Sequence, residues 1–372
     1  MYRFYSFVFS FLIMQTIVGQ TNIGGTIISN DTLNLAGSPY IVTGTVTINS
    51  GVSVTVDSAV QVRFQTGTSL LVYGSLQARH ALFTSTNDTS GGSPAAGDWN
   101  YIQVGYSASG TLVMDTCTVR YGGGNSSYPA NIYVYNGSAD LTGCDISNSN
   151  NQGLRLYGGT THLNHTNISS CNWPIIYINS VSLEFNGVNN LANNTHAGIY
   201  IYATSTSNAF VLDTIDVPYF FDRNFTVNSG GTLQIASSNI VKFNSGVRLT
   251  INGKLKANAG MGENIYFTAY TDDNLGGDTN NDGMLTTPGS HYWDGIQFND
   301  ASIDSACIVR KCQFSFAGSG SIGAVTTYNA GPTIDSCAFD NNYYGVMMNN
   351  VSTPVFSNRF CKLNFPVSVY QL

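Results

Sequence analysis

The sequence predicts an all-β solenoid, a rod in which short strands stack coil upon coil. Two observations lead to this prediction. Residues 39–78 and residues 218–257 align with each other without a gap. Inside each copy, shorter segments of about 22 residues recur. Units this short, built from strands and turns, bury their apolar side chains only by stacking on their neighbours. The chain is therefore expected to form two tandem copies of one repetitive fold.

The composition favours a packed rod over other classes of protein. Charged residues make up 9% of the 372 residues, against roughly 25% in typical soluble domains. Hydrophobic residues make up 42%, which is enough for a core and excludes a disordered chain. The net charge of -7 argues against a nucleic-acid partner, which would require a basic surface.

Residues 1–20 are predicted to be a secretory signal peptide. An apolar run over 4–18 follows Arg3 and is shorter than the ~20 residues of a membrane-spanning helix. An uncleaved membrane anchor is the alternative interpretation. No later run is long enough to cross a bilayer. We therefore expect a secreted protein, extracellular or attached to the cell surface, with no membrane span after signal removal.

The strands are expected in a regular order after the signal. Residues 21–38 are polar and are predicted to cap the first coil. Copy 1, residues 39–217, opens with apolar and polar residues in alternation, as over 52–56, and Gly-containing turns separate these runs. A period of two predicts strands with one buried face. Similar strands are then expected at 131–135, 153–157, 175–178 and 198–202.

Copy 2, residues 218–372, repeats this plan, and Trp293 takes the place of Trp99. Copy 2 stops before it has repeated all the segments of copy 1. This predicts either that the sequence is a fragment or that something else covers the last rung.

The seven cysteines are odd in number, so they cannot form a complete disulfide framework. Cys117 and Cys144 occupy equivalent places in successive repeats, and so do Cys312 and Cys337. Because a buried thiol behaves as a small hydrophobe, stacked core thiols are expected rather than disulfides. No spacing typical of a zinc site occurs.

These repeats, together with the Gly-Asp-Asn-rich segment at 276–283 before Trp-Asp-Gly-Ile at 293–296, resemble a known family. They are similar to right-handed parallel β-helix proteins of the pectin-lyase-like superfamily, in particular large secreted repeat proteins of environmental bacteria. The resemblance covers nearly all of 39–372 and implies a right-handed parallel β-helix. At ~22 residues per coil the mature chain would make about 15 coils. No single activity is implied, because this fold hosts lyases, hydrolases, esterases, adhesins and inert stalks.

An acidic loop predicts a structural calcium site. Asp278, Asn280 and Asp282 stand at alternate positions and Gly283 follows them, a pattern that resembles the start of a calcium-binding loop. Gly289, however, stands where such a loop has a bidentate Glu. A solvated Asn/Asp turn is the alternative. The candidate ligands are Asp272, Asp273, Asp278, Asn280 and Asp282.

A tyrosine column predicts a glycan-binding face. Tyrosines alternate with Ile and Leu along the strands expected around Arg155. Because Ile and Leu face the core, the tyrosines are expected to face outwards, where their rings and hydroxyls suit a polysaccharide. The alternative is an aromatic ladder that only stabilises neighbouring rungs or lies under loops. The candidates are Tyr133, Tyr177 and Tyr200, and one step along Tyr135, Tyr157 and Tyr202.

No catalytic residue is predicted. The Gly-His-Gly, Arg-x-Lys and Arg-x-Pro-x-x-Arg motifs of enzymes in the superfamily are absent. A lyase built from Asp278, Asp282 and Lys311 is an alternative, since a base beside calcium can abstract a proton. The leading hypothesis is a non-enzymatic binding or adhesion module for a polysaccharide or cell-surface glycan. A polysaccharide lyase or glycoside hydrolase, and a structural spacer in a larger surface protein, are the alternatives.

Overall fold

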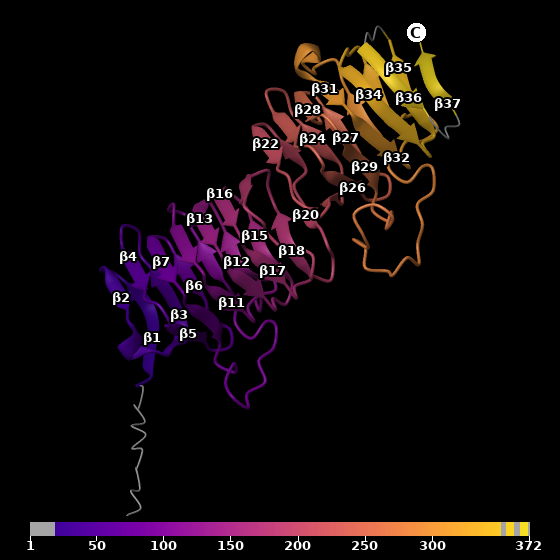
Figure 1. The fold of residues 1–372 in the computed structure, drawn as a ribbon. Coiled ribbons are helices and arrows are strands. Elements are labelled where there is room, and N and C mark those ends of the chain that lie inside the picture. Colours follow the sequence, from indigo (N-terminus) through magenta and orange to yellow (C-terminus); the bar gives the residue numbers. More distant parts are fainter. Residues whose placement is uncertain (1–18, 351–354, 361–364, 371–372) are drawn as a thin grey trace, which may run out of the picture.

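The computed structural model describes residues 19–350, 355–360 and 365–370. Over these residues the fold is the predicted all-β parallel solenoid, with about 14 turns (Figure 1). The described helical segments are two single 3-10 turns, η1 (Leu35–Gly37) and η2 (Asp304–Ala306). The predicted signal peptide lies almost wholly outside the described residues.

Most coils of copy 1 contribute three strands, which pair in parallel with their equivalents in neighbouring coils, and in the first two coils one long strand spans both the first and the second place. The first strands are β1 (Thr21–Ile27), β3 (Tyr40–Ile48), β5 (Gln61–Phe64), β8 (Leu82–Ser85), β11 (Thr118–Arg120), β14 (Asp145–Ser147) and β17 (Asn167–Ser169). The second strands are β6 (Leu70–Val72), β9 (Ile102–Val104), β12 (Ala130–Val134), β15 (Gln152–Leu156), β18 (Trp173–Tyr177) and β20 (Ile199–Ile201). The third strands are β2 (Asp31–Leu33), β4 (Ser53–Val56), β7 (Ser75–Arg79), β10 (Thr111–Asp115), β13 (Gly137–Thr142), β16 (Gly159–Asn164) and β19 (Ser182–Asn186).

Copy 2 repeats the arrangement of three strands per coil. Its first strands are β23 (Tyr219–Phe221), β26 (Ile240–Phe243), β29 (Ile265–Ala269) and β32 (Cys312–Ser315). Its second strands are β21 (Ser205–Thr206), β24 (Phe225–Val227), β27 (Arg248–Ile251), β30 (Gly295–Phe298), β33 (Val325–Tyr328), β35 (Tyr344–Asn349) and β37 (Phe365–Tyr370). Its third strands are β22 (Ala209–Leu212), β25 (Thr232–Ile235), β28 (Lys254–Asn258) and β31 (Ile308–Arg310), while β34 (Thr333–Asp340) and β36 (Val355–Phe360) each pass from a third place into the next first place.

Residues 21–38 form a coil of their own. β1 pairs in parallel with β3, and β2 pairs in parallel with β4. The segment expected to cap the rod is therefore built as its first strand-containing rung, and β1 leaves one edge of the sheet unpaired among the described strands.

The interior is filled by in-register ladders of mostly apolar side chains, and in places the stacked residues are identical. Phe314 stacks on Phe267 at 4.9 Å between ring centroids and on Phe339 at 5.0 Å, with the rings within 9° of parallel. Six cysteines lie buried and free, which confirms the prediction of core thiols for these six; Cys361 lies outside the described residues. Burial raises the pKa of the Cys144 thiol to about 12, so that this thiol stays neutral and packs as a hydrophobe.

One column of paired strands runs without a break from copy 1 into copy 2. The other columns of strands are interrupted between the copies. β18 pairs with β20, β20 with β23, and β23 with β26. In copy 1 this column holds the second strand of each coil, whereas in copy 2 it holds the first. The copies are thus stacked with a shift of one column, visible as a step in the rod (Figure 1). The sheets of copy 2 begin at β21 and β22, somewhat before the boundary expected at residue 218.

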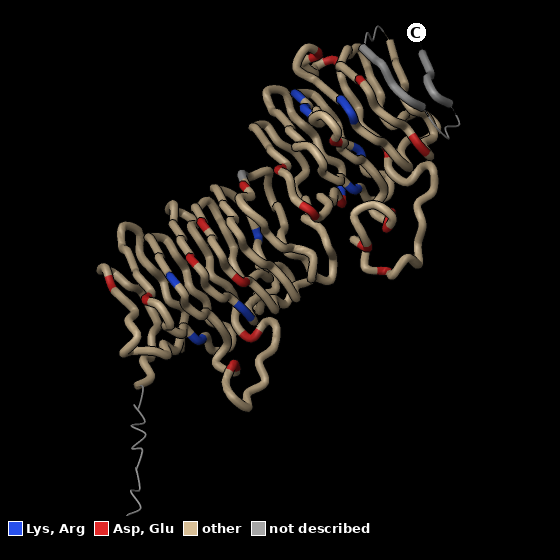
Figure 2. The backbone as a smooth tube through the Cα atoms, in the orientation of Figure 1, with Lys and Arg blue, Asp and Glu red and all other residues tan. Residues whose placement is uncertain are grey.

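Two long excursions leave the rod, one from each copy. The first joins β8 to β9 and the second joins β29 to β30. Both excursions project from the same side of the rod (Figure 1). Acidic residues lie along the second excursion, whereas charged residues are sparse on the coils (Figure 2).

Candidate functional site

One row of outward-facing side chains runs along the continuous column and crosses the junction. Alternation within each strand places one such residue per coil, about 4.8 Å from the next. We call this set the outward row. Its members are Gln103, Tyr133, Arg155, Ile176, Tyr200, Phe220, Lys242 and Thr268.

The prediction that Tyr177 faces outwards is wrong. Tyr177 pairs with the core residue Leu156 and has no exposed surface, while Ile176 takes the outward place. The segment that links β15 to β18 is one residue shorter than the even spacing of the tyrosines suggests. A slip of one residue in a strand moves every side chain to the opposite face, so the tyrosine enters the core.

Six tyrosines pack against one another on the outer side of copy 1, and we call them the tyrosine cluster. They come from three successive coils. Tyr135 and Tyr157 stack face to face at 4.4 Å and 4°, and Tyr128 stacks on Tyr133 at 5.1 Å. The full set is Tyr101, Tyr106, Tyr128, Tyr133, Tyr135 and Tyr157.

Exposure differs strongly within the tyrosine cluster. Tyr133 lies at its base, 2% exposed, and burial raises the pKa of its phenol well above the usual value. Tyr106 is 57% exposed and Tyr128 is 39% exposed. Neither residue is predicted from the sequence, because both belong to connecting segments and not to strands. Their rings nevertheless form part of the accessible surface.

Arg155 lies among these rings. Its guanidinium carbon is 6.0 Å from the ring centroid of Tyr128 and 5.8 Å from that of Tyr133. Both distances fall within the range of cation–π attraction. The predicted neighbourhood of Arg155 and outward tyrosines is therefore present around Tyr133, Tyr135 and Tyr157.

A second, smaller group of tyrosines lies at the junction. The Tyr200 hydroxyl donates to Asp222 Oδ2 at 2.9 Å, and burial together with this carboxylate raises the pKa of Tyr200 to about 12. The Arg223 guanidinium lies 3.7 Å from the ring centroid of Tyr202, which is 41% exposed, and Arg223 also pairs with Asp222. Ile176 separates this group from the tyrosine cluster.

The excursion of copy 2 folds back over the junction onto copy 1. Thr279 is fully buried there, and its carbonyl oxygen lies 2.9 Å from His196 Nδ1. The ring of Tyr270, at the start of the excursion, stacks on Phe220 at 3.9 Å, and Trp173 stacks on both His196 and Phe220. Sequence reasoning missed this contact because its partners are far apart along the chain and belong to different copies.

The acidic loop brings together three of its predicted ligands. Ligand oxygens of Asp273, Asp278 and Asp282 all lie within 4.8 Å of one another. Both carboxylate oxygens of Asp273 and the side-chain oxygen of Asn280 are buried without a hydrogen-bond partner. Burial and the carboxylate of Asp278 raise the pKa of Asp273. Asp272 is not among the carboxylates that meet here, and its Oδ2 accepts a 2.6 Å hydrogen bond from Thr268 Oγ1.

Lys242, which is not predicted from the sequence, contacts this loop. Its ammonium is fully buried and donates to the carbonyl oxygens of Asp272 and Gly277 at 2.9 and 2.7 Å. Burial lowers the pKa of Lys242 to about 8. Lys311 instead donates to the carbonyl oxygen of Gly260. The arrangement of Asp278 and Asp282 with Lys311 as a base is thus not formed, and Lys242 is enclosed on the protein side of the loop.

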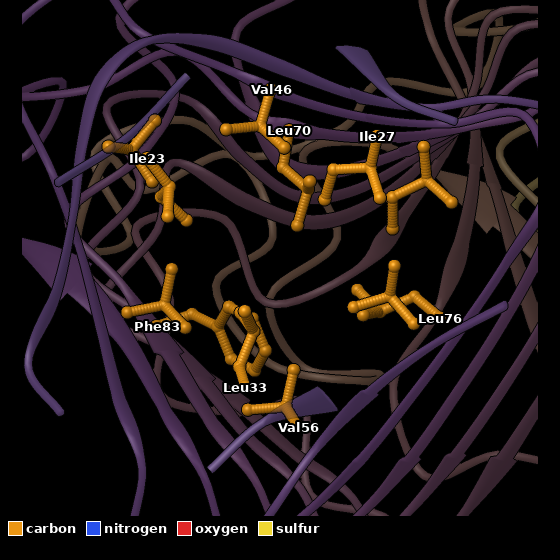
Figure 3. Close-up of a pocket in the computed structure, with 12 residues that line it drawn as sticks. Ile23, Ile27, Leu33, Val46, Val56, Leu70, Leu76 and Phe83 are labelled. Atoms are coloured by element: carbon orange, nitrogen blue, oxygen red, sulfur yellow. The ribbon is translucent and has the colours of Figure 1, made fainter. Parts of the chain in front are cut away.

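A small apolar hollow lies inside the first coils of copy 1. Only apolar side chains line it, and Figure 3 shows Ile23, Leu33, Val56 and Phe83 pointing towards its centre. A hollow without a hydrogen-bonding side chain cannot orient a polar ligand. It is a loosely filled part of the core, and the outer surface is the better candidate for binding.

Comparisons with known proteins give no relative for this chain. It matches no protein-family model, no curated protein and no solved structure. Within the part of the chain that the structure describes, none of the helical segments has the length and apolar character to cross a bilayer.

Proposed function

We propose that this protein is a secreted or cell-surface β-helix of the pectin-lyase-like kind that binds a polysaccharide or cell-surface glycan without cleaving it, as an adhesion module. The observation that carries the proposal is the tyrosine cluster. Its rings offer apolar faces and hydroxyl groups side by side over three coils, with Tyr106 and Tyr128 well exposed. Such a surface packs against the C–H faces of sugars and also hydrogen-bonds their hydroxyls.

The geometry of the rod supports a ligand that is itself a chain. Aromatic groups recur at the coil spacing of about 4.8 Å, so a polymer lying along the rod axis meets several of them in succession. Many weak contacts along one chain add to a useful affinity because the later contacts form at a high effective concentration.

Affinity electrophoresis through gels that contain neutral or acidic polysaccharides tests the proposal. We expect the protein to be retarded by at least one polymer, and Tyr135→Ala with Tyr157→Ala to lose that retardation while its melting temperature stays close to that of the native protein. Tyr266→Ala, a truncation in copy 2, is the matched control and should remain retarded. Release of new chain ends from any polymer would instead show an enzyme. If the protein is neither retarded by a polymer nor cleaves one, the proposal fails and a structural spacer is the remaining hypothesis.

We also propose that the acidic loop binds structural calcium through Asp273, Asp278, Asp282 and Asn280. The buried, unpartnered oxygens of Asp273 and Asn280 support this proposal, because such oxygens are costly unless a cation or a donor meets them. Oxygen donors of this type are the ligands that calcium prefers. Asp272 is left out of the ligand set for the reason given above.

Chelation tests the calcium proposal. A metal that binds only the folded protein stabilises it by about 2.7 kcal/mol at a hundred times its dissociation constant. We therefore expect EDTA to lower the melting temperature by several degrees, and readded calcium to restore it. Asp278→Asn with Asp282→Asn should abolish this response, whereas Asp98→Asn in the excursion of copy 1 should keep it. A melting temperature that does not change on addition of EDTA would contradict the calcium proposal.

A further inference from the structure

We infer that the glycan bound at the tyrosine cluster carries an anionic group, a carboxylate or a sulfate ester, and that Arg155 binds this group. The inference rests on the proposed function and names the class of ligand for the same site. It starts from a difference between Arg155 and the other arginines.

The other arginines between residues 19 and 350 have carboxylate or amide partners. Arg63 donates two hydrogen bonds to the amide oxygen of Gln61, at 3.0 and 2.7 Å. Five further arginines each lie 2.7 to 3.1 Å from an aspartate oxygen. These pairs are Arg79–Asp115, Arg120–Asp88, Arg223–Asp222, Arg248–Asp294 and Arg310–Asp335.

Arg155 has no carboxylate partner within the described residues. Its Nε–H is buried without a hydrogen-bond partner. The groups that surround the guanidinium are the phenols of Tyr128 and Tyr133, and desolvation lowers the pKa of Arg155. A half-buried cation without a counter-ion costs free energy, which a ligand anion at this place would offset.

The guanidinium also lies where such an anion would arrive. Tyr157 directly follows β15 and lies two residues after Arg155 in extended chain, so both face outwards with about 7 Å between their positions. A sugar ring packed on the stacked pair of Tyr135 and Tyr157 therefore holds its substituents within reach of Arg155. The planar fork of a guanidinium matches carboxylate and sulfate oxygens.

The surroundings favour an anionic sugar over a small inorganic anion. One side of the guanidinium is occupied by aromatic rings, which offer apolar contact but no further positive charge. No second cation of copy 1 lies in the outward row beside Arg155, since its neighbours there are Tyr133 and Ile176. A free anion would thus gain one charged contact, whereas a glycan would gain that contact and the stacking area together.

Affinity electrophoresis with matched polymers tests the inference. The polymers are dextran, carboxymethyl dextran and dextran sulfate, together with the neutral, carboxymethyl and sulfate forms of cellulose and galactan. We expect an anionic form to retard the protein at least about tenfold more strongly than its neutral parent, since a hydrogen-bonded charge contact contributes on this scale. The carboxymethyl and sulfate arms show which anion is preferred.

Arg155→Gln should reduce the affinity for the anionic form to that for the neutral form. Arg155→Lys keeps the charge but loses the fork, and should fall between the two. Arg79→Gln is the control, because it removes one positive charge from a different face of the same copy. Each variant is checked by its melting temperature. Arg155→Gln should be at least as stable as the native protein, since it removes a cation that lacks a counter-ion.

The outcomes separate this inference from the proposed function. Equal retardation by neutral and anionic polymers, or an anion preference that Arg155→Gln leaves unchanged, would overturn the inference and keep the glycan-binding module. Equal losses in Arg155→Gln and Arg79→Gln would show a general charge effect and would also overturn it. If no polymer retards the native protein, both the proposed function and this inference fail.

Discussion

Copy 1 and copy 2 share a coil plan but differ in what their excursions and outer faces carry. In both copies a tryptophan from the end of the excursion stacks on a phenylalanine of an earlier coil at 4.2 Å, Trp99 on Phe64 and Trp293 on Phe243. In both, a threonine hydroxyl donates to an aspartate four residues later at 2.6 Å. The coil and the anchoring of the excursion are thus the same.

The differences lie one residue away from these shared contacts. Arg63 of copy 1 lies at the surface and bonds to Gln61, whereas the equivalent Lys242 of copy 2 is buried under the acidic loop. Both excursions carry acidic residues (Figure 2), but a cluster of three carboxylates within 4.8 Å of one another forms on the excursion of copy 2. The tyrosine cluster belongs to copy 1. A repeat can therefore preserve its core while its loops and outward residues take up separate tasks.

The largest expected effect tests the shared part. Trp99→Ala and Trp293→Ala should each lower the free energy of unfolding by about 3–5 kcal/mol, because each removes a fully buried ring and leaves a cavity. Denaturant titration followed by far-UV circular dichroism measures both. A large loss in one copy with little change in the other would break the claimed equivalence of the two anchors.

A pH titration sharpens the contrast between Arg63 and Lys242. The folded pKa of Lys242, about 8, lies below its unfolded value of about 10.5, so the unfolded chain binds the extra proton between these pH values. The contribution of Lys242 to stability is therefore unfavourable below pH 8 and rises by about 3 kcal/mol as the pH approaches 10.5.

Tyrosines titrate in the same window, so the measured quantity is the difference in unfolding free energy between native protein and Lys242→Met at each pH. This difference should shift in favour of the native protein by about 3 kcal/mol. The matching difference for Arg63→Met should stay flat, because arginine remains charged throughout. A flat result for Lys242 as well would mean that its ammonium is better solvated than its burial indicates.

The smallest effect concerns Tyr177. Its hydroxyl is buried without a hydrogen-bond partner, so Tyr177→Phe should leave stability unchanged or raise it by about 1 kcal/mol. Retardation by polysaccharides should not change, in contrast to Tyr135→Ala with Tyr157→Ala. Loss of retardation in Tyr177→Phe, with an unchanged melting temperature, would contradict the inward orientation of this ring.

Much of the fold was predictable because a solenoid expresses its geometry as repetition. Alternation along 52–56 and 60–64 predicts strands, and the recurrence of Cys117 at Cys144 predicts in-register stacking, since like residues must meet like residues in successive coils. These are relations between neighbouring coils, and a coil has about the length of the pattern. For the same reason the outward orientation of Tyr133 and Tyr200 followed from their Ile and Leu neighbours.

What the pattern could not decide were relations that depend on a single residue or on distant segments. One residue fewer between β15 and β18 turns Tyr177 into the core, a change that an average period hides. The shift of one column between the copies, and the burial of Thr279 beside His196, arise only when two copies pack against each other. That Arg155 has no carboxylate partner among the described residues likewise depends on its neighbours in space, because electrostatic partners are set by distance and not by order along the chain.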